Sequence, residues 1–384
     1  MDADLAEVNA LGEQLMQAGR PHEALALFDL AVNGDSGNGL YVNNRAVARA
    51  ELGDLVGAVR DLERAITFPA HRRLAALNYS AIGQNHLRFV RRALLHCREY
   101  LASGGSDERE QFAIAIDTLQ RQTAIADAWL ADWVAGMSTH AREKVNHTAE
   151  VAQFVQMGEV IAKLVLDNLP GMSSAETILD FGVGLGRVLW PLVQMLPGAS
   201  FIGYDVDPAM INSVRKIQDM ADVRVLHSTT DIADASVDAT FVISVFTHLD
   251  VTTDYWLGEL KRVLKVGGRA FISFHDDTIY HELHDAKKIE PQLPRNFSGR
   301  ITTGAGAQGS TLMASFYETA EWERTLGRFF RVIKSAPRGL LDYQSFSVVE
   351  KVDDRNDVLT HQRTYIRDLE NDVYRLRENA KLEF

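Results

Sequence analysis

The residues best suited to chemistry lie in one short stretch near the middle of the chain, ILDFGVGLGR at positions 178–187. An apolar run there ends in Asp180, and glycines follow at alternate positions, Gly182, Gly184 and Gly186. Glycine permits a tight turn with positive φ and has no Cβ, so a ligand can lie directly against the backbone. A carboxylate just before such a turn can accept a hydrogen bond from a cationic amine. The stretch therefore predicts a site for a small molecule that carries an ammonium group.

A second acidic residue supports this interpretation. The next strand-like run ends at Asp205, nineteen residues beyond Gly186, where a carboxylate can accept hydrogen bonds from both hydroxyls of a ribose. The main alternative is a nicotinamide or flavin dinucleotide site, whose fingerprint places the third glycine three residues after the second. Here that position is Arg187, and the third glycine comes after two residues instead. The spacing favours a ligand with an ammonium group and no pyrophosphate; a purely structural loop is the remaining alternative.

Short apolar runs alternate with helical patterns from about Val151 to Lys351 and would position these residues. Five of the runs are too continuously apolar for a sheet with one wet face: TILDFGV, SFIGYDV, VRVLHS, ATFVISV and GRAFISF. They predict a parallel sheet covered by helices on both faces. Two more runs, FFRVIKS and YQSFSVVEK, are joined by the turn-like residues 336–339, which predicts an antiparallel hairpin at the sheet edge. The expected fold is α/β with seven strands, the last of them reversed.

Residues 151–352 resemble class I S-adenosylmethionine-dependent methyltransferases through this glycine turn, its two acids and the order of the strands. The resemblance implies a Rossmann-like seven-stranded domain with S-adenosylmethionine as its cofactor. It implies that the methionine end is held by Asp180, Gly182, Gly184 and Gly186, and the ribose by Asp205. It also implies that the adenine is bordered by Thr229, Thr230 and Asp231, and that the floor of the site is lined by Ser244 and Val245.

Two further stretches resemble bacterial methyltransferases associated with polysaccharide and surface-glycan assembly. They are SVFTHL at 244–249 and WLGELKRVLKVGG at 256–268. Relatives often carry proline where Val266 stands, and a proline-rich turn in place of residues 229–231. This resemblance implies O-methylation of a sugar, a glycan or another small-molecule acceptor.

Methyl transfer to oxygen is an in-line displacement from a sulfonium, so positioning supplies most of the catalysis and a base takes the acceptor's proton. His248 and His275 follow the fourth and fifth predicted strands, where a base is expected, and His248 is the first choice. For each, the alternative is a hydrogen-bonded core histidine. The polar stretch from Asp276 to Phe316 is interpreted either as a lid or acceptor loop or as a disordered insertion. No metal site is predicted.

The first hundred residues repeat with a period of 34, the length at which two antiparallel helices recur in tetratricopeptide arrays. At this offset Gly12, Gly19, Ala24, Phe28 and Ala31 match Ala46, Gly53, Ala58, Leu62 and Ala65. Residues 1–103 therefore resemble tetratricopeptide repeats, and residues 104–150 are expected to form capping and linker helices. Such an array implies a scaffold that can bind a protein partner.

The last residues, 356–384, place apolar side chains at alternating heptad core positions: Leu359, Ile366, Leu369, Val373, Leu376 and Ala380. The pattern predicts a short coiled coil that makes the protein a homo-oligomer. The alternative is one amphipathic helix docked on its own domain. Because the chain ends inside the pattern, we also expect it to be a fragment of a longer protein.

Composition limits the function further. A formal net charge of -12 argues against a nucleic-acid partner, which would need clusters of Lys and Arg. The sequence has neither a signal-like start nor eighteen consecutive apolar residues, so a cytoplasmic protein without a transmembrane segment is expected.

Two other functions are alternatives to a glycan or small-molecule methyltransferase. One is a protein methyltransferase that recruits its substrate through the repeats, and the other is an assembly adaptor with a vestigial methyltransferase fold.

Overall fold

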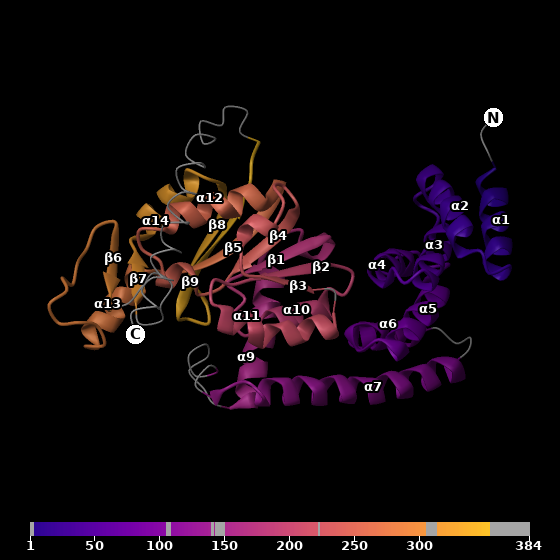
Figure 1. The fold of residues 1–384 in the computed structure, drawn as a ribbon, viewed down its shortest axis with the longest axis horizontal. Coiled ribbons are helices and arrows are strands. Elements are labelled where there is room, and N and C mark those ends of the chain that lie inside the picture. The colour runs from indigo at the N-terminus through magenta and orange to yellow at the C-terminus, as the bar shows by residue number, and fades with distance from the viewer. Residues whose placement is uncertain are drawn as a thin grey trace. The chain divides into compact units, whose positions relative to one another are not determined.

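The computed structural model describes residues 4–104, 109–139, 142, 150–221, 223–304 and 313–353. The chain divides into two compact units. The first comprises Met1–Asp231 with Asp238–Phe241, and the second comprises Ile232–Val237 with Val242–Phe384. Figure 1 labels the helices and strands.

The first unit begins with helices that pack against their neighbours along the chain. They are α1 (Leu5–Gln17), α2 (Pro21–Gly34), α3 (Gly39–Glu51), α4 (Leu55–Ile66), α5 (Arg72–Asn85), α6 (Val90–Ala102) and the long α7 (Arg109–Ala135). The side chains of Asp4, Asn38 and Asp54 cap the first turns of α1, α3 and α4 by accepting hydrogen bonds from backbone N–H groups. The prediction of an all-helical N-terminal region is confirmed.

The pattern of small and large residues in these helices has a packing reason at Gly12. A Cβ added at Gly12 would lie 2.6 Å from Cε1 of Phe28, so the phenyl ring fills the space that a side chain would need. At the equivalent positions in the second copy, Ala46 and Leu62 are both buried in the helical core. Where the first copy combines glycine with a large phenyl ring, the second copy combines the larger alanine with the smaller side chain of leucine.

The remainder of the first unit contains four predicted strands, all parallel. They are β1 (Thr177–Phe181), β2 (Ser200–Tyr204), β3 (Val223–Leu226) and β4 (Val237–Val242), in the order β3-β2-β1-β4. Helix α9 (Val151–Asn168) precedes β1, while α10 (Leu189–Met195) and α11 (Pro208–Val214) follow β1 and β2. Because Phe181 pairs with Tyr204 in parallel register, the segments that leave β1 and β2 emerge at the same edge of the sheet.

The second unit contains the other predicted strands. The long β5 (Leu264–Asp276) follows α12 (Thr253–Val263) and pairs antiparallel with β9 (Gln344–Glu350). Strand β8 (Arg331–Leu340) follows α14 (Thr319–Gly327) and pairs antiparallel with β9. The antiparallel hairpin is therefore confirmed and the sheet is mixed, but the prediction of its turn at 336–339 is wrong. Strand β8 continues through these residues with an irregular register, and the turn lies at 341–343.

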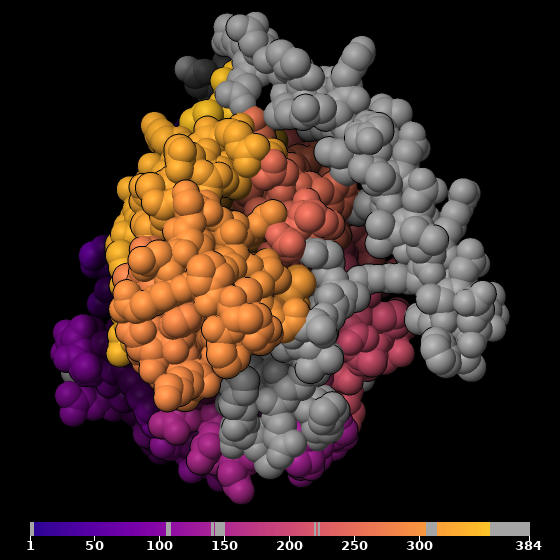
Figure 2. Space-filling model, turned by 90° about the vertical axis from the view of Figure 1, so that its left-hand side faces the viewer, coloured from indigo at the N-terminus to yellow at the C-terminus, as the bar shows by residue number. Residues whose placement is uncertain are grey.

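The stretch from Asp276 to Phe316 differs from its interpretation as a loop or a disordered insertion. It forms α13 (Asp277–Asp285), β6 (Arg300–Thr303) and β7 (Ala314–Tyr317). Strand β7 pairs in parallel with the end of β5 and antiparallel with β6. The segment has a core of its own, in which the buried side chains are Ile279, Tyr280, Ile289 and Phe316. Figure 2 shows it as a compact orange surface on the face turned toward the viewer.

Two of the sequence predictions lie wholly or partly outside the described residues. The coiled coil at 356–384 lies wholly outside them, and the capping and linker region 104–150 lies partly outside them. In the part of the chain that the structure describes, no helix has the length and apolar character needed to cross a membrane.

Candidate active site

The glycine turn after β1 is held by backbone hydrogen bonds. The N–H groups of Gly182 and Val183 both donate to the carbonyl of Tyr204, at 2.7 and 2.8 Å. The φ angles are +85° at Gly182, +52° at Gly184 and +74° at Gly186, a region that residues with a Cβ rarely adopt. The path of the chain therefore favours glycine at all three positions, independently of any ligand.

The carboxylate of Asp205 fastens the middle of this turn. Its Oδ2 accepts a hydrogen bond from the Gly184 N–H at 2.8 Å, and its Oδ1 accepts one from the Asp207 N–H at 2.9 Å. Each carboxylate oxygen can accept a second hydrogen bond, so hydroxyl groups of a ligand can still be bound. The structure thus brings Asp205 and the glycine turn together, as the sequence predicts.

The space around the second and third glycines differs. A Cβ built on Gly184 would have no heavy atom within 4 Å, whereas one on Gly186 would lie 2.7 Å from Cγ2 of Val214 and 3.2 Å from Cη2 of Trp133. Gly184 leaves open space beside the backbone. Gly186 instead allows neighbouring helices to approach the turn, which is a packing role that differs from the contact with the methionine end implied by the resemblance.

Asp180 is a buried acid at the start of the turn, with 4% of its surface exposed. Burial raises its pKa well above the usual value, and the nearby carboxylate of Asp205 raises it further, while the Arg187 guanidinium opposes both effects. Burial also lowers the pKa of Arg187 to about 10. A cationic amine bound here would stabilise the ionised form of Asp180.

Residues 229–231 follow β3 and form a short 3-10 helix in the first unit. Thr229 is buried, and the backbone N–H of Thr230 donates to the Ser228 hydroxyl at 3.2 Å. The carbonyl of Asp231 accepts a hydrogen bond from Arg224. The segment is ordered by these contacts, and its predicted role beside an adenine remains a prediction.

Ser244, in the second unit, has a φ of +59°, which is unusual for a residue with a Cβ and is found more often at functional sites. Its N–H donates to the Ser273 hydroxyl at 2.8 Å, and its own hydroxyl accepts from Nε2 of Gln344 at 2.8 Å. The next residue, Val245, is half-buried. These contacts from β5 and β9 hold the segment in its strained conformation.

His248 lies in a short 3-10 helix, Phe246–His248, and its ring has a defined orientation. Nδ1 lies 2.6 Å from the carbonyl oxygen of Met313. Because a carbonyl can only accept, Nδ1 must carry the hydrogen, and in the neutral ring Nε2 then carries the lone pair. The structure thus leaves Nε2 as the nitrogen that can accept a proton.

His275, at the end of β5, has a different environment. Its ring stacks on Phe316 at 5.0 Å and meets the edge of Tyr343 at 5.7 Å. Burial, together with the neighbouring His248, lowers its pKa to about 3 against the opposing effect of Asp276. No well-formed hydrogen bond from the described residues reaches either ring nitrogen, although the Ser315 backbone lies close enough to raise the pKa slightly. Its burial and lowered pKa make His275 a poor general base, although the hydrogen bond that the core alternative implies is not formed by the described residues.

Some residues of the site escape sequence reasoning. Gln344 begins β9, and its Oε1 is buried without a hydrogen-bond partner among the described residues. A polar residue at the start of the apolar run YQSFSVVEK was the available signal. Trp133 contacts the glycine turn from α7, and the sequence carries no signal of that contact beyond its apolar helical pattern.

Comparison with known proteins identifies the class of this fold. Residues 179–270 match the family model described as a methyltransferase domain. The chain is also 25% identical over 182 residues to a malonyl-[acyl-carrier protein] O-methyltransferase of Hahella chejuensis, an alignment that covers 43% of this chain. It covers 62% of that relative, which is less than two thirds of its length.

Solved structures of methyltransferases are similar to this chain as well. A chain in the complex of the Haloferax volcanii Trm112 methyltransferase activator with its methyltransferase is 17% identical, with a TM-score of 0.40, and the match covers 58% of this chain and 98% of that one. An O-methyltransferase family protein of Burkholderia thailandensis is 13% identical, with a TM-score of 0.40, and the match covers 53% and 59%.

The family match and the mixed sheet define a methyltransferase domain with a Rossmann-like fold. Domains of this class use S-adenosylmethionine as the methyl donor.

Proposed function

We propose that this chain is an S-adenosylmethionine-dependent methyltransferase that methylates a hydroxyl oxygen of a sugar, a glycan or another small molecule. The observation that carries the proposal is the fastening of Gly184 by Asp205 beside open space, within the segment that matches a methyltransferase domain. This arrangement offers an acid for a ribose and bare backbone for the methionine end. The cytoplasm is the compartment we assign to the protein.

The residues of the first unit would hold the cofactor. Asp180 would bind the ammonium group, because its burial leaves few other ways to stabilise its charge. Asp205 would accept hydrogen bonds from the ribose hydroxyls through its remaining lone pairs. The bare backbone at Gly182 and Gly184 would lie against the methionine end, and the turn at Thr229, Thr230 and Asp231 would border the adenine. When bound, the cofactor supplies a methyl group made electrophilic by the sulfonium.

The residues of the second unit would serve the acceptor. His248 would take the hydroxyl proton at Nε2 while Met313 holds the opposite side of its ring. Ser244 and Val245 would line the floor. The O-methyltransferase activity in the name of the Hahella relative supports an oxygen acceptor, and the stretches at 244–249 and 256–268 support a glycan.

The N-terminal helices would bind a protein partner. We assign residues 1–103 to tetratricopeptide repeats, residues 104–150 to capping and linker helices, and residues 151–352 to the catalytic domain. A second candidate function follows from these helices, which is methylation of a protein recruited by them. The segment 356–384 would assemble the chain into an oligomer.

Replacing Asp205 by alanine should weaken binding of S-adenosylmethionine by about one to two powers of ten, since a charge-assisted hydrogen bond contributes about 1.5–3 kcal/mol. The variant loses both a ribose acceptor and the contact that fastens Gly184. Isothermal titration calorimetry measures the change. Asp207→Ala is the matched control, because it removes an acid two residues away that caps α11. Equal affinity in the parent and in Asp205→Ala would contradict the site.

The raised pKa of Asp180 predicts pH-dependent binding of S-adenosylhomocysteine. A cationic amine binds the ionised carboxylate, and the free protein holds this carboxyl protonated below its raised pKa. Affinity should therefore rise with pH, by at most about tenfold per pH unit, until the pH exceeds that pKa or the amine of the ligand begins to lose its own proton. Calorimetry at a series of pH values tests this. Asp180→Asn should bind more weakly and lose the dependence, and a flat profile in the parent would contradict the role of Asp180.

The acceptor can be identified with labelled S-adenosylmethionine. Sugar nucleotides, lipid-linked oligosaccharides and a protein extract are incubated separately with the enzyme. Label in the carbohydrate fractions supports the first proposal, and label confined to protein supports the second.

A further inference from the structure

The side chain of Trp133 connects the last helix of the N-terminal series to the glycine turn. It lies near the end of α7 and is 4% exposed. Two atoms of its indole, Cη2 and Cζ2, lie 3.2 and 3.8 Å from the place that a Cβ on Gly186 would occupy. Its Nε1 donates a hydrogen bond to the carbonyl of Ser213, in α11, at 3.1 Å. One side chain thus contacts the third glycine of the turn and holds the helix that follows β2.

The backbone beyond Gly186 is confined from a second side. A Cβ added at Gly158 of α9 would lie 2.1 Å from the carbonyl oxygen of Arg187, so α9 packs directly on that peptide. The space left between α7, α9 and the turn is small, about 10 Å³, which is close to the minimum for a single water molecule. These close contacts with Trp133 and α9 restrict the movement of Gly186 and Arg187.

The side of the same turn that faces open space is at Gly184, two residues before Gly186. Gly184 has empty space beside it and is fastened to Asp205. A shift of Gly186 changes the path of the backbone into Gly184, because the short turn between them is closed by a hydrogen bond from the Gly186 N–H to the Val183 carbonyl at 2.8 Å. The position of Trp133 therefore bears on the geometry of the cofactor side.

We propose that Trp133 is a positioning residue for the cofactor, which it serves by holding Gly186 and α11 without touching the ligand. The inference rests on the proposed function. It extends the cofactor site to α7, which lies outside the segment matched by the methyltransferase family model.

Two further tryptophans lie next to Trp133, so the inference can be tested by fluorescence with a matched control. Trp129 lies 5.4 Å from Trp133 and 4.9 Å from Trp190 between ring centroids, and Trp133 lies 6.4 Å from Trp190. Of the two tryptophans on α7, Trp133 contacts the turn, whereas the ring contacts of Trp129 are with the other two indoles. Ligand binding at the turn should change the emission of Trp133.

The experiment compares Trp133→Phe with Trp129→Phe, which removes the same atoms from the same cluster. S-adenosylhomocysteine is the probe, calorimetry gives its affinity, and intrinsic fluorescence gives the change on binding. Trp133→Phe shortens the ring and loses the hydrogen bond to Ser213, so we expect roughly threefold to tenfold weaker binding and loss of most of the fluorescence change. Trp129→Phe should bind like the parent and keep the change. Trp133→Tyr replaces Trp133→Phe if the latter does not fold.

The outcomes are distinct. A parent that binds no S-adenosylhomocysteine would overturn the proposed function and the inference with it. A parent that binds, with Trp133→Phe equal to it in affinity and in fluorescence change, would overturn the inference alone. Equal weakening in both phenylalanine variants would also overturn it, because the effect would then belong to packing of the whole cluster.

Discussion

Replacing His248 by alanine is expected to lower the turnover rate by about two to four powers of ten and to leave cofactor affinity nearly unchanged. A sugar hydroxyl is a very weak acid, so its attack on the sulfonium is helped by a group that accepts the proton as the new bond forms. The Met313 carbonyl fixes the hydrogen on Nδ1 of His248 and so directs the basic nitrogen, Nε2, away from that contact. Single-turnover rates and calorimetry, performed once an acceptor is known, separate the two effects.

His248→Asn is the informative companion to the alanine variant. Its amide can still donate a hydrogen bond to Met313, but it has no basic nitrogen, so its rate should fall as far as that of His248→Ala. Recovery of activity in His248→Asn would show that the ring serves only to hold the Met313 segment. Full activity in His248→Ala with loss in His275→Ala would transfer the role of base to His275, in spite of its lowered pKa.

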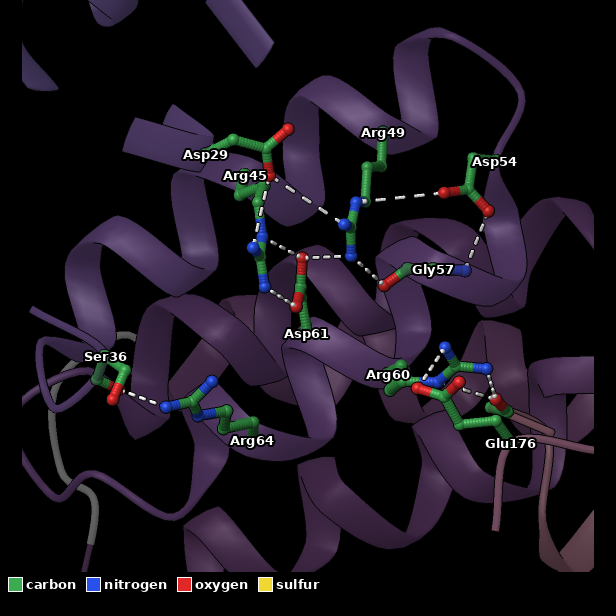
Figure 3. Close-up of polar contacts among 11 residues, drawn as sticks. Asp29, Ser36, Arg45, Arg49, Asp54, Gly57, Arg60, Asp61, Arg64 and Glu176 are labelled. Atoms are coloured by element: carbon green, nitrogen blue, oxygen red, sulfur yellow. Dashed lines mark hydrogen bonds and ion pairs between the residues drawn. The ribbon is translucent and has the colours of Figure 1, made fainter. Parts of the chain in front are cut away.

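Replacing Asp61 by alanine is expected to lower the free energy of unfolding by about 3–5 kcal/mol, because removing one member of a buried ionic network leaves its partners uncompensated. Asp61 is 4% exposed and accepts hydrogen bonds from two arginines. Arg45 donates through Nε at 2.8 Å and Nη2 at 2.7 Å, and Arg49 donates through Nη1 at 2.8 Å (Figure 3). Without Asp61 the two guanidinium groups would keep only exposed carboxylates as ionic partners.

Asp29→Ala is the matched control for this variant. The Asp29 carboxylate contacts the same two arginines, at 3.2 and 3.9 Å, but its side chain is 43% exposed. Exposed ion pairs contribute little, so its loss should cost at most about 1 kcal/mol. Urea unfolding of the parent and both variants at one pH provides the comparison. Similar losses in the two variants would mean that burial does not determine the strength of this network.

The strands and the glycine turn could be predicted from the sequence because their signals are local. Continuous apolar runs specify buried parallel strands, and alternate glycines with an acid before them specify a turn that only glycine can follow. The strands in the segment from Asp276 to Phe316 could not be predicted in this way, because they have four residues each and mix polar with apolar side chains. Their pairing depends on β5, a contact that periodicity within the segment does not reveal.

The same holds for the individual site residues: those with a local sequence signal could be predicted, and those that depend on contacts between distant segments could not. Asp205 could be placed because it ends a strand beside the turn. The burial of His275 could not, because it depends on Phe316 and Tyr343, which reach it from separate strands and turns. The different reasons for Gly184 and Gly186 were also hidden, since they depend on what lies beside each glycine and not on the spacing between them.

The fit between Gly12 and Phe28 limits how the helical units could be exchanged or recombined. In the first repeat copy a glycine, which has no side chain, lies against a phenyl ring, whereas the second copy has a methyl group and an isobutyl group at the corresponding positions, Ala46 and Leu62. Gly12→Ala alone would drive the new methyl group into the ring, and Phe28→Leu alone would leave a void. Chimeric arrays built from these units must therefore inherit both members of a pair together, so the smallest portable module is a whole helical hairpin.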